Sequence, residues 1–274
     1  MSRRSKVILG YLLIVLGICI PLYGFLKLSK NIVFSKGKFD SFMKGDQVYD
    51  RSMEKKVDEY SDSLTRDVAI VDPFANDNYA SDYSFMKNKD EIFAYLSIPK
   101  IDLMEPIYLD ASKKHLAMGV AHIEGTDLPS DKIGRRSVIA GHRGYYEAIM
   151  FWNLGKLSEG DLIYISWPNK TLEYKVIGSE IIEPWEWEKL DPVEGKNILT
   201  LLTCDPLTPP RKNRLLVNCD LQKKEDEISK DKIKKVVDVA EGVKTTNYII
   251  LGITILLMLT LLLFIFKLIK FLKA

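Results

Sequence analysis

The run ILTLLTCDP, residues 198–206, ends in a thiol whose placement suits nucleophilic chemistry. Its apolar residues are typical of a buried strand, and the Asp-Pro that follows Cys204 ends that strand. A side chain at a strand end lies at the rim of a sheet or barrel, where it can meet a substrate. Free cysteine is also among the most buried residue types, so a packing role for Cys204 is an equal alternative on these residues alone. Cys219, inside the alternating run RLLVNCD, is more typical of packing.

A nucleophilic Cys204 needs a base or a cationic partner, because the thiolate is the reactive form and the pKa of a free thiol is about 8.5. The chain has three histidines. His115 lies in a helical or turn context, and His122 follows it in GVAHIEGT. His142 closes the apolar run SVIA and opens into Gly-His-Arg-Gly, so it lies at a strand end as Cys204 does. This placement favours His142 as the base.

Acyl transfer by a thiolate also needs a preorganised donor for the oxyanion. Arg214 begins the strand RLLV, directly after the loop DPLTPPRKN that follows the thiol. Because this loop returns the chain beside the strand that it left, we expect Arg214 to lie near the thiol. Arg211 and Lys212, inside the loop, are alternatives.

Short β-like runs separated by turn signals occupy the chain from Ile92 onward. We expect strands at FAYLSI, EPIYL, RSVIAGH, DLIYISW, LEYKVIGSEII, ILTLLTC and RLLVNCD. Such a mainly β pattern, with few helices, indicates a closed barrel or a sandwich. Upstream, apolar residues recur at helical spacing from Phe39 to Leu64, which predicts an amphipathic helix or a helix pair broken near Gly45.

Two apolar stretches, residues 7–28 and 248–266, flank this region. Each is close to the roughly 20 residues that a helix needs to cross a bilayer. The first is too long for a signal peptide and no small-x-small cleavage site follows it, so we expect an uncleaved anchor. Lys and Arg precede the first stretch and follow the second, and short segments rich in these residues stay cytoplasmic. We therefore expect two spans of the plasma membrane, with both termini cytoplasmic and the region between them extracytoplasmic.

Composition excludes several other classes of function. The formal net charge is +2 and no basic run is interleaved with aromatic residues, so we expect no nucleic acid partner. Three cysteines are fewer than an extracytoplasmic domain held by disulfides normally carries. The sequence has no metal-ligand cluster and no phosphate-binding loop, so we expect no cofactor.

Together these features resemble the sortase family. The resemblance covers residues 90–221 and rests on Cys204 ending a strand after Leu-Thr, Arg214 opening the next strand, and His142 ending an earlier one. It implies a closed eight-stranded β-barrel with short helices, an N-terminal helical and lid segment, and two transmembrane helices. Sortases are Gram-positive cell-surface transpeptidases that cleave a sorting signal such as Leu-Pro-x-Thr-Gly, hold the acyl group on cysteine and pass it to an amine. On this resemblance Cys204 is the nucleophile, His142 the general acid and base, and Arg214 the clamp for substrate and oxyanion.

The segments GVAHIEGTDLP and GHRG, the two spans and the long N-terminal loop look like class C, the pilus-polymerising sortases. That class carries a lid with Asp-Pro-Phe or Asp-Pro-Trp, and Asp72, Pro73 and Phe74 stand where the lid belongs. The likeness implies that Asp72 pairs with Arg214 and that the ring of Phe74 covers the sulfur of Cys204. The tripeptide by itself is equally typical of an ordinary turn.

The chain departs from that class at two points. Asp205 follows the thiol where many pilus sortases have a small or hydroxyl residue, and the loop DPLTPPRKN carries an unusual pair of prolines. The choice of Arg214 over Arg211 and the sorting motif therefore stay open.

The leading hypothesis is a pilin-polymerising transpeptidase, whose partners are pilin subunits with a sorting signal of the LPxTG type and an acceptor lysine. One alternative is a housekeeping-type sortase, which anchors proteins to peptidoglycan. An alternative of another class is a non-enzymatic surface assembly protein with a disulfide between Cys204 and Cys219.

The expected organisation has seven segments. They are a cytoplasmic basic end (1–6), a transmembrane anchor (7–28), an N-terminal helical region with the lid loop (31–90), a catalytic β-barrel (91–222), a charged tether (223–247), a transmembrane helix (248–266) and a cytoplasmic basic tail (267–274).

Overall fold

The structure is a computed structural model that describes residues 3–45, 48–64, 70–75, 83, 86, 88, 90–144, 148–225 and 242–273. The chain divides into two compact units. One comprises residues 1–35, 146–148 and 241–274, and the other comprises residues 36–145 and 149–240.

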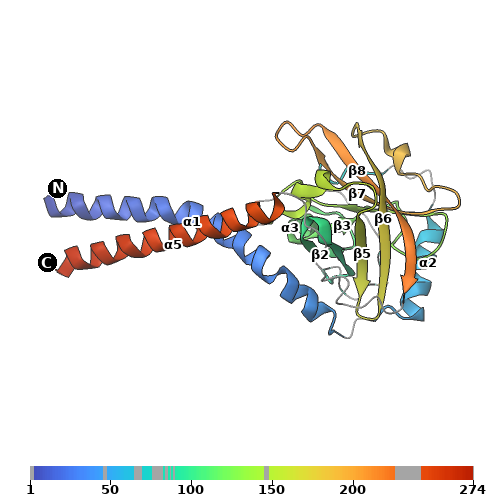
Figure 1. The fold of residues 1–274 in the computed structure, drawn as a ribbon, viewed down its shortest axis with the longest axis horizontal. Coiled ribbons are helices and arrows are strands. Elements are labelled where there is room, and N and C mark those ends of the chain that lie inside the picture. The colour runs from blue at the N-terminus through green and yellow to red at the C-terminus, as the bar shows by residue number, and fades with distance from the viewer. Residues whose placement is uncertain are drawn as a thin grey trace. The chain divides into compact units, whose positions relative to one another are not determined.

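The first unit is built on two long helices, α1 (Arg3–Phe42) and α5 (Val243–Lys273), which run alongside each other (Figure 1). Both are long and apolar enough to cross a membrane. The Oγ atom of Ser29 lies 2.7 Å from the Oγ1 atom of Thr254, so a hydrogen bond between hydroxyl groups joins the helices. The apolar stretches 7–28 and 248–266 lie inside these helices, and both helices extend beyond them.

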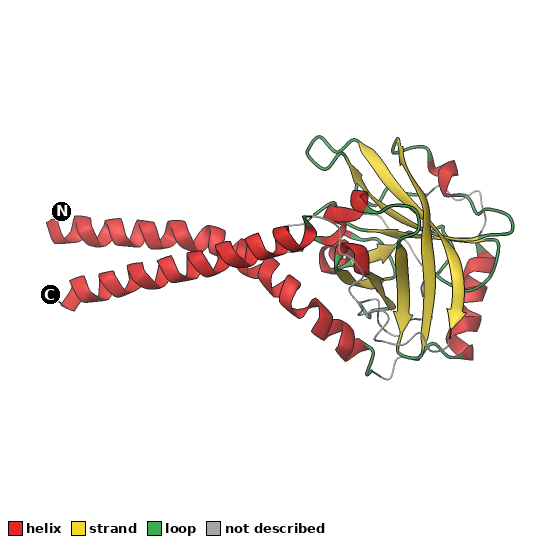
Figure 2. Cartoon of the chain, in the orientation of Figure 1, coloured by secondary structure: helices red, strands yellow, loops and turns green. Residues whose placement is uncertain are grey.

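The second unit is a closed β-barrel, drawn in yellow in Figure 2, which confirms the expected fold. Its strands are β1 (Ala94–Ile98), β2 (Leu103–Tyr108), β3 (Val120–His122), β4 (Arg135–Ala140), β5 (Leu162–Trp167), β6 (Lys170–Ile182), β7 (Asn197–Asp205) and β8 (Asn213–Glu225). Around the barrel they follow the order β1-β2-β3-β4-β7-β8-β6-β5. The strand-by-strand prediction from the sequence did not include β3. Its three residues are too few to show an alternating pattern.

Short helices surround the barrel: α2 (Arg51–Ser63), α3 (Lys113–Met118), and the 3₁₀ helices η1 (Pro99–Ile101), η2 (Met150–Lys156) and η3 (Trp187–Leu190). Helix α2 begins where the carboxylate of Asp50 accepts a hydrogen bond of 2.8 Å from the backbone N–H of Met53. Since α1 ends at Phe42 and α2 starts at Arg51, the predicted break near Gly45 is confirmed.

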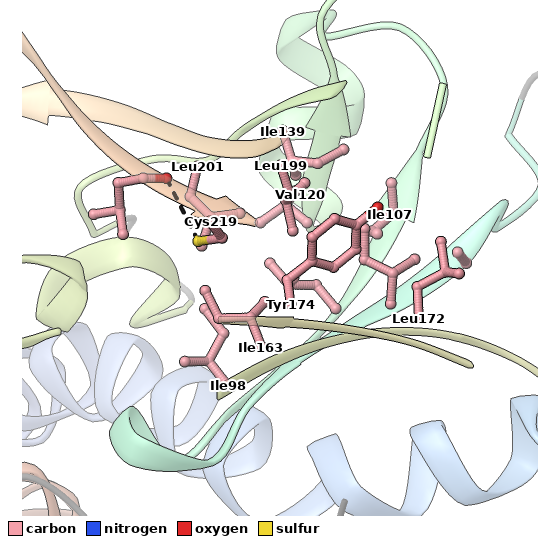
Figure 3. Packing of buried hydrophobic residues seen from close by; sticks show 14 of the residues in the cluster. Ile98, Ile107, Val120, Ile139, Ile163, Leu172, Tyr174, Leu199, Leu201 and Cys219 are labelled. Atoms are coloured by element: carbon pink, nitrogen blue, oxygen red, sulfur yellow. Dashed lines mark hydrogen bonds between the residues drawn. The ribbon is translucent and has the colours of Figure 1, made fainter. Parts of the chain in front are cut away.

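The barrel interior is a continuous apolar core (Figure 3). Strand alternation points Leu199 and Leu201 of β7 inward, where they meet Cys219 of β8. Cys219 is fully buried, and burial raises the pKa of its thiol far above the ordinary value. The packing role predicted for Cys219 is therefore confirmed.

The outer face of the same strands carries a second apolar cluster. It contains Ala140 of β4, Leu202 of β7 and Leu216 of β8, which are fully buried although they point away from the barrel interior. Phe74 and Trp187, from segments outside the barrel, pack against this cluster. The outer face is thus covered next to the point where β7 ends.

The charged tether predicted at 223–247 lies largely outside the described residues. Residues 223–225 belong to the end of β8, and α5 begins at Val243, so both neighbouring elements reach further than the sequence indicated.

Candidate active site

Cys204 and Arg214 are directly opposite partners in the antiparallel ladder of β7 and β8. Opposite residues in such a ladder project to the same face, with their Cβ atoms about 4.5–5.5 Å apart. Cys204 is partly buried and Arg214 is only 5% exposed. The structure therefore brings the predicted nucleophile and the predicted clamp together at one end of the barrel.

The segment carrying His142 is fixed to the same strand end. Strand β4 runs parallel to β7 with Ala140 opposite Leu202. The backbone N–H of Gly141 donates to the carbonyl of Leu202 (3.0 Å), and the hydroxyl of Thr203 donates to the carbonyl of Gly141 (2.7 Å). His142, the next residue, is thereby held beside the end of β7.

Glycine is required at position 141 for a steric reason. A Cβ atom added there would lie 2.7 Å from the ring of Phe151. The backbone N–H of Phe151 in turn donates to the carbonyl of His142 (3.0 Å), so this close approach is part of what fixes the His142 segment.

The Asp-Pro-Phe segment contacts this arrangement. The carboxylate of Asp72 accepts hydrogen bonds from Nε (3.2 Å) and Nη2 (2.5 Å) of Arg214. The ring of Phe74 lies 5.7 Å from the ring of His142 and 5.4 Å from the guanidinium carbon of Arg214. Pro73 is buried between these two residues in the chain. The segment thus contacts two of the three predicted catalytic residues, while the expected contact of Phe74 with the Cys204 sulfur stays a prediction.

A family model of the sortase domain matches residues 96–222. The structure is similar to sortase C-3 from Streptococcus pneumoniae, with 36% identity, a TM-score of 0.64, and coverage of 78% of this chain and 100% of that one. It is also similar to sortase C2 of pilus island 1 from group B Streptococcus, with 31% identity, a TM-score of 0.58, and coverage of 64% of this chain and 99% of that one. The chain belongs to the sortase family.

Among characterised sequences, this sortase is 28% identical to sortase A of Staphylococcus aureus over 179 residues, which cover 63% of this chain and 79% of that one. Members of the family are cysteine transpeptidases. The two solved structures named above are class C sortases, whereas the characterised sequence named above is a sortase A.

The electrostatic surroundings of Cys204 oppose ionisation in this closed arrangement. Burial raises the pKa of its thiol above the ordinary value, and the carboxylate of Asp72 acts in the same direction. The cations Arg214, Arg211 and Arg143 lower the pKa, and their combined effect is smaller than that of burial and Asp72. The neutral thiol is therefore the favoured form while the Asp-Pro-Phe segment is in place.

His142 is shifted in the complementary direction. Burial lowers the pKa of its imidazole below the ordinary value, and the charge of Arg211 lowers it further. The neutral imidazole is the form that accepts a proton, so His142 is poised as a base at neutral pH.

The two alternative cations in the loop after β7 are placed differently from Arg214. Arg211 donates from Nε and Nη2 to the carbonyl of Leu207 (3.2 and 3.0 Å), so it closes its own loop. Lys212 is exposed. Arg214 alone of these three lies opposite Cys204 in the ladder, which favours it as the clamp.

The other two histidines have structural partners. His122 is fully buried between the hydroxyl of Tyr83 (2.8 Å) and the carbonyl of Asp127 (2.9 Å), and burial lowers its pKa to about 4. His115 is 2% exposed and lies between the carboxylates of Asp110 (2.7 Å) and Asp90 (3.1 Å). Both are integrated in hydrogen-bond networks of the barrel and its flanking helix.

The disulfide alternative is wrong, because Cys204 and Cys219 are both free and too far apart. The ladder places Cys219 opposite Leu199, and Cys204 lies five residues further along β7. At about 3.3 Å per residue this separates the two by roughly 16 Å, whereas a disulfide needs Cα atoms within about 7 Å.

One pair of charged residues at the site was missed by sequence reasoning. Arg143 and Asp205 form an ion pair of 3.8 Å between Nη2 and Oδ1. Two features of the sequence could have indicated this pair. Each residue directly follows a predicted catalytic residue, and Asp205 departs from the class pattern.

A small alkylating reagent should distinguish the two cysteines outside α1. We expect iodoacetamide to modify Cys204 and to leave Cys219 unmodified in the folded protein, because Cys219 is enclosed in the core and its thiol is held neutral. Peptide mapping of the full chain by mass spectrometry, in a Cys19→Ser background, measures both sites. Unfolded protein, in which both cysteines react, is the control, and modification of Cys219 at the rate of Cys204 would contradict the assigned strand register.

Proposed function

We propose that this sortase is a pilin-polymerising transpeptidase. It takes the sorting signal of one pilin, of the LPxTG type, as acyl donor and the lysine of another pilin as acceptor. The observation that supports the proposal is the pairing of Asp72 with Arg214 near the Phe74 ring, because this ion pair is one of the two contacts that the resemblance to class C implies for a lid. The likeness to solved class C sortases supports it.

In the proposed reaction neutral His142 accepts the proton of the Cys204 thiol, and the resulting thiolate attacks the carbonyl carbon of the threonine in the sorting signal. Arg214 donates hydrogen bonds to the oxyanion that forms, and protonated His142 gives its proton to the departing glycine amine. This leaves the acyl group as a thioester on Cys204. The lysine amine then attacks the thioester, His142 accepts its proton, and the thiolate is released as the new amide forms.

The lid and the substrate compete for the same cation under this proposal. While Asp72 occupies the guanidinium of Arg214, that group cannot bind an oxyanion. Lid opening removes a carboxylate from the neighbourhood of Cys204 and hydrates the thiol, and both changes lower its pKa. Access and activation of the nucleophile are therefore coupled in one movement.

We expect Cys204→Ala to abolish transpeptidation without unfolding the barrel, since a partly buried side chain at a strand end contributes little to the core. His142→Ala and Arg214→Ala should each reduce kcat/KM by about 10²-fold or more, because acid–base and oxyanion contributions have that size. Arg211→Ala, which removes a neighbouring cation from the loop between β7 and β8, is the matched control and should stay close to wild type. The measurement is release of the Gly-containing product from a fluorogenic sorting peptide.

A thioester adduct of the wild-type protein, detected by mass spectrometry at Cys204, completes this test. An essential Arg211 with a dispensable Arg214 would overturn the assignment of the clamp.

The double variant Asp72→Ala and Phe74→Ala should open the site. The ion pair of Asp72 with Arg214 and the ring contacts of Phe74 hold the segment in place, and we propose that a minor open population exists in the wild type. We expect faster alkylation of Cys204 and faster hydrolysis of a sorting peptide in the double variant. Glu59→Ala, which removes an exposed carboxylate of α2, is the control. Equal alkylation rates in wild type and double variant would show that the segment is only a turn.

An anchoring reaction to peptidoglycan is the second candidate, favoured by the similarity to sortase A. The acceptor distinguishes the two. Under the pilin proposal a lysine-containing pilin supports transfer, whereas a peptidoglycan cross-bridge peptide does not; the opposite preference identifies the anchoring enzyme.

We further propose that α1 and α5 are membrane spans with both termini in the cytoplasm and the barrel outside. The apolar length of both helices and the basic residues at both chain ends support this orientation. A reporter that is active only in the cytoplasm, fused after residue 274, should be active in intact cells. If a reporter that is active only outside the cytoplasm shows activity when fused at the same position, the proposed topology is wrong.

A further inference from the structure

The ion pair between Arg143 and Asp205 connects the two catalytic segments of the chain. Arg143 directly follows His142, and Asp205 directly follows Cys204. Their Nη2 and Oδ1 atoms are 3.8 Å apart, and only 8% and 18% of the two side chains is exposed. The pair therefore links the segment after β4 to the end of β7 by a largely buried charge–charge contact.

Strand geometry places this pair on the opposite side of β7 from Cys204. Alternation along β7 puts Cys204 on the outer face with Leu202, while Thr203 and Asp205 point to the opposite side. Arg143 reaches the same region, because its Nη2 atom lies 3.8 Å from the Oδ1 atom of Asp205. The thiol and the ion pair thus occupy the two sides of one strand end.

The burial of Arg143 is costly for the fold. It is 7% exposed, and burial lowers the pKa of its guanidinium, with Asp205 acting against that shift. Its Nε and Nη1 atoms have no hydrogen-bond partner among the residues that the structure describes. A buried cation with incomplete pairing is destabilising compared with an apolar side chain, so its presence beside a reactive site points to a role in the chemistry.

We propose that Arg143 and Asp205 are a positioning pair, which holds the His142 segment against the Cys204 strand end and balances the charge around the thiol. This inference rests on the proposed function of the same site. The carboxylate at position 205 offsets the Arg143 cation on the reverse side of the strand. This charge balance would explain why a charged residue, Asp205, directly follows the proposed nucleophile.

Other charges also face the thiol and remain in place when the pair is altered. They are Arg214 from β8, Asp72 from the Asp-Pro-Phe segment and Arg211 from the loop between β7 and β8. Arg211 also acts on His142 and on Arg143. A test of the pair must therefore change Arg143 and Asp205 alone and compare the single variants with the double variant.

The test uses the full-length protein in detergent with Cys19→Ser and Cys219→Ala as background. The midpoint pH of Cys204 alkylation by iodoacetamide is measured for Arg143→Gln, Asp205→Asn and the double variant. Removing the cation should raise the midpoint by about one pH unit, because a nearby positive charge favours the thiolate. Removing the carboxylate should lower it by a similar amount, since Arg143 is then no longer offset. The double variant should return close to the background protein.

Kinetics with a sorting peptide give a second readout. Each single variant should lower kcat several-fold with little change in KM, because neither residue binds the peptide and both act through His142 and Cys204. The double variant should recover part of the loss, which is the signature of coupled residues. The charge-preserving variants Arg143→Lys and Asp205→Glu should retain the midpoint pH and are the controls for folding, together with the melting temperature.

Midpoints that do not move in either single variant, or that move in the same direction in both, would overturn the proposal and leave an ordinary structural ion pair. So would strictly additive losses of kcat. The alkylation readout requires no sorting peptide. The two single variants could shift the midpoint in opposite directions in a protein that shows no transpeptidase activity. That result would refute the proposed function but would support the charge balance between Arg143 and Asp205.

Discussion

The register between β7 and β8 is the constraint on which the site depends. It places Cys204 directly opposite Arg214 at the end of a ladder that continues down to the pair of Ile198 and Asp220. A slip of one residue would turn Cys204 toward the barrel interior and Thr203 toward the outer face, because side chains alternate with a period of two. The apolar residues on both faces of β7 hold the register, since each slip would exchange their two environments.

Arg214 then connects the barrel to the Asp-Pro-Phe segment. The same guanidinium that lies opposite the thiol in the ladder is held by the carboxylate of Asp72 and lies beside the ring of Phe74. Because the outer face of β4, β7 and β8 is apolar, the segment covers it by packing as well as by charge. Burial beside this segment favours the neutral form of both Cys204 and His142, so the thiol is held in its less reactive form. Under the proposed function, opening changes solvent access and charge together, which couples substrate entry to activation of the thiol.

At the end of β7, residues on the two faces of the strand make different contacts. Cys204 lies on the outer face, while the neighbouring Thr203 and Asp205 face the other way and contact the segment that carries His142. Thr203 does so through the carbonyl of Gly141, and Asp205 through Arg143. Adjacent residues of one strand thus supply the proposed nucleophile and the contacts that fix its partner. Precision at the site comes from backbone pairing first and from side-chain contacts second.

Much of this protein is determined by local sequence. The two long apolar helices, the break near Gly45, most strands, and the strand-end positions of Cys204 and His142 follow from hydropathy, periodicity and turn residues, which act over a few neighbouring positions. Tertiary structure alone decided the closure of the barrel through β3, the placement of Arg214 rather than Arg211 opposite the thiol, the wide separation of Cys204 from Cys219, and the meeting of Arg143 with Asp205. These features depend on which strands pair and in which register. Pairing and register are set by contacts between residues far apart in the chain, so the sequence of a short segment cannot predict them.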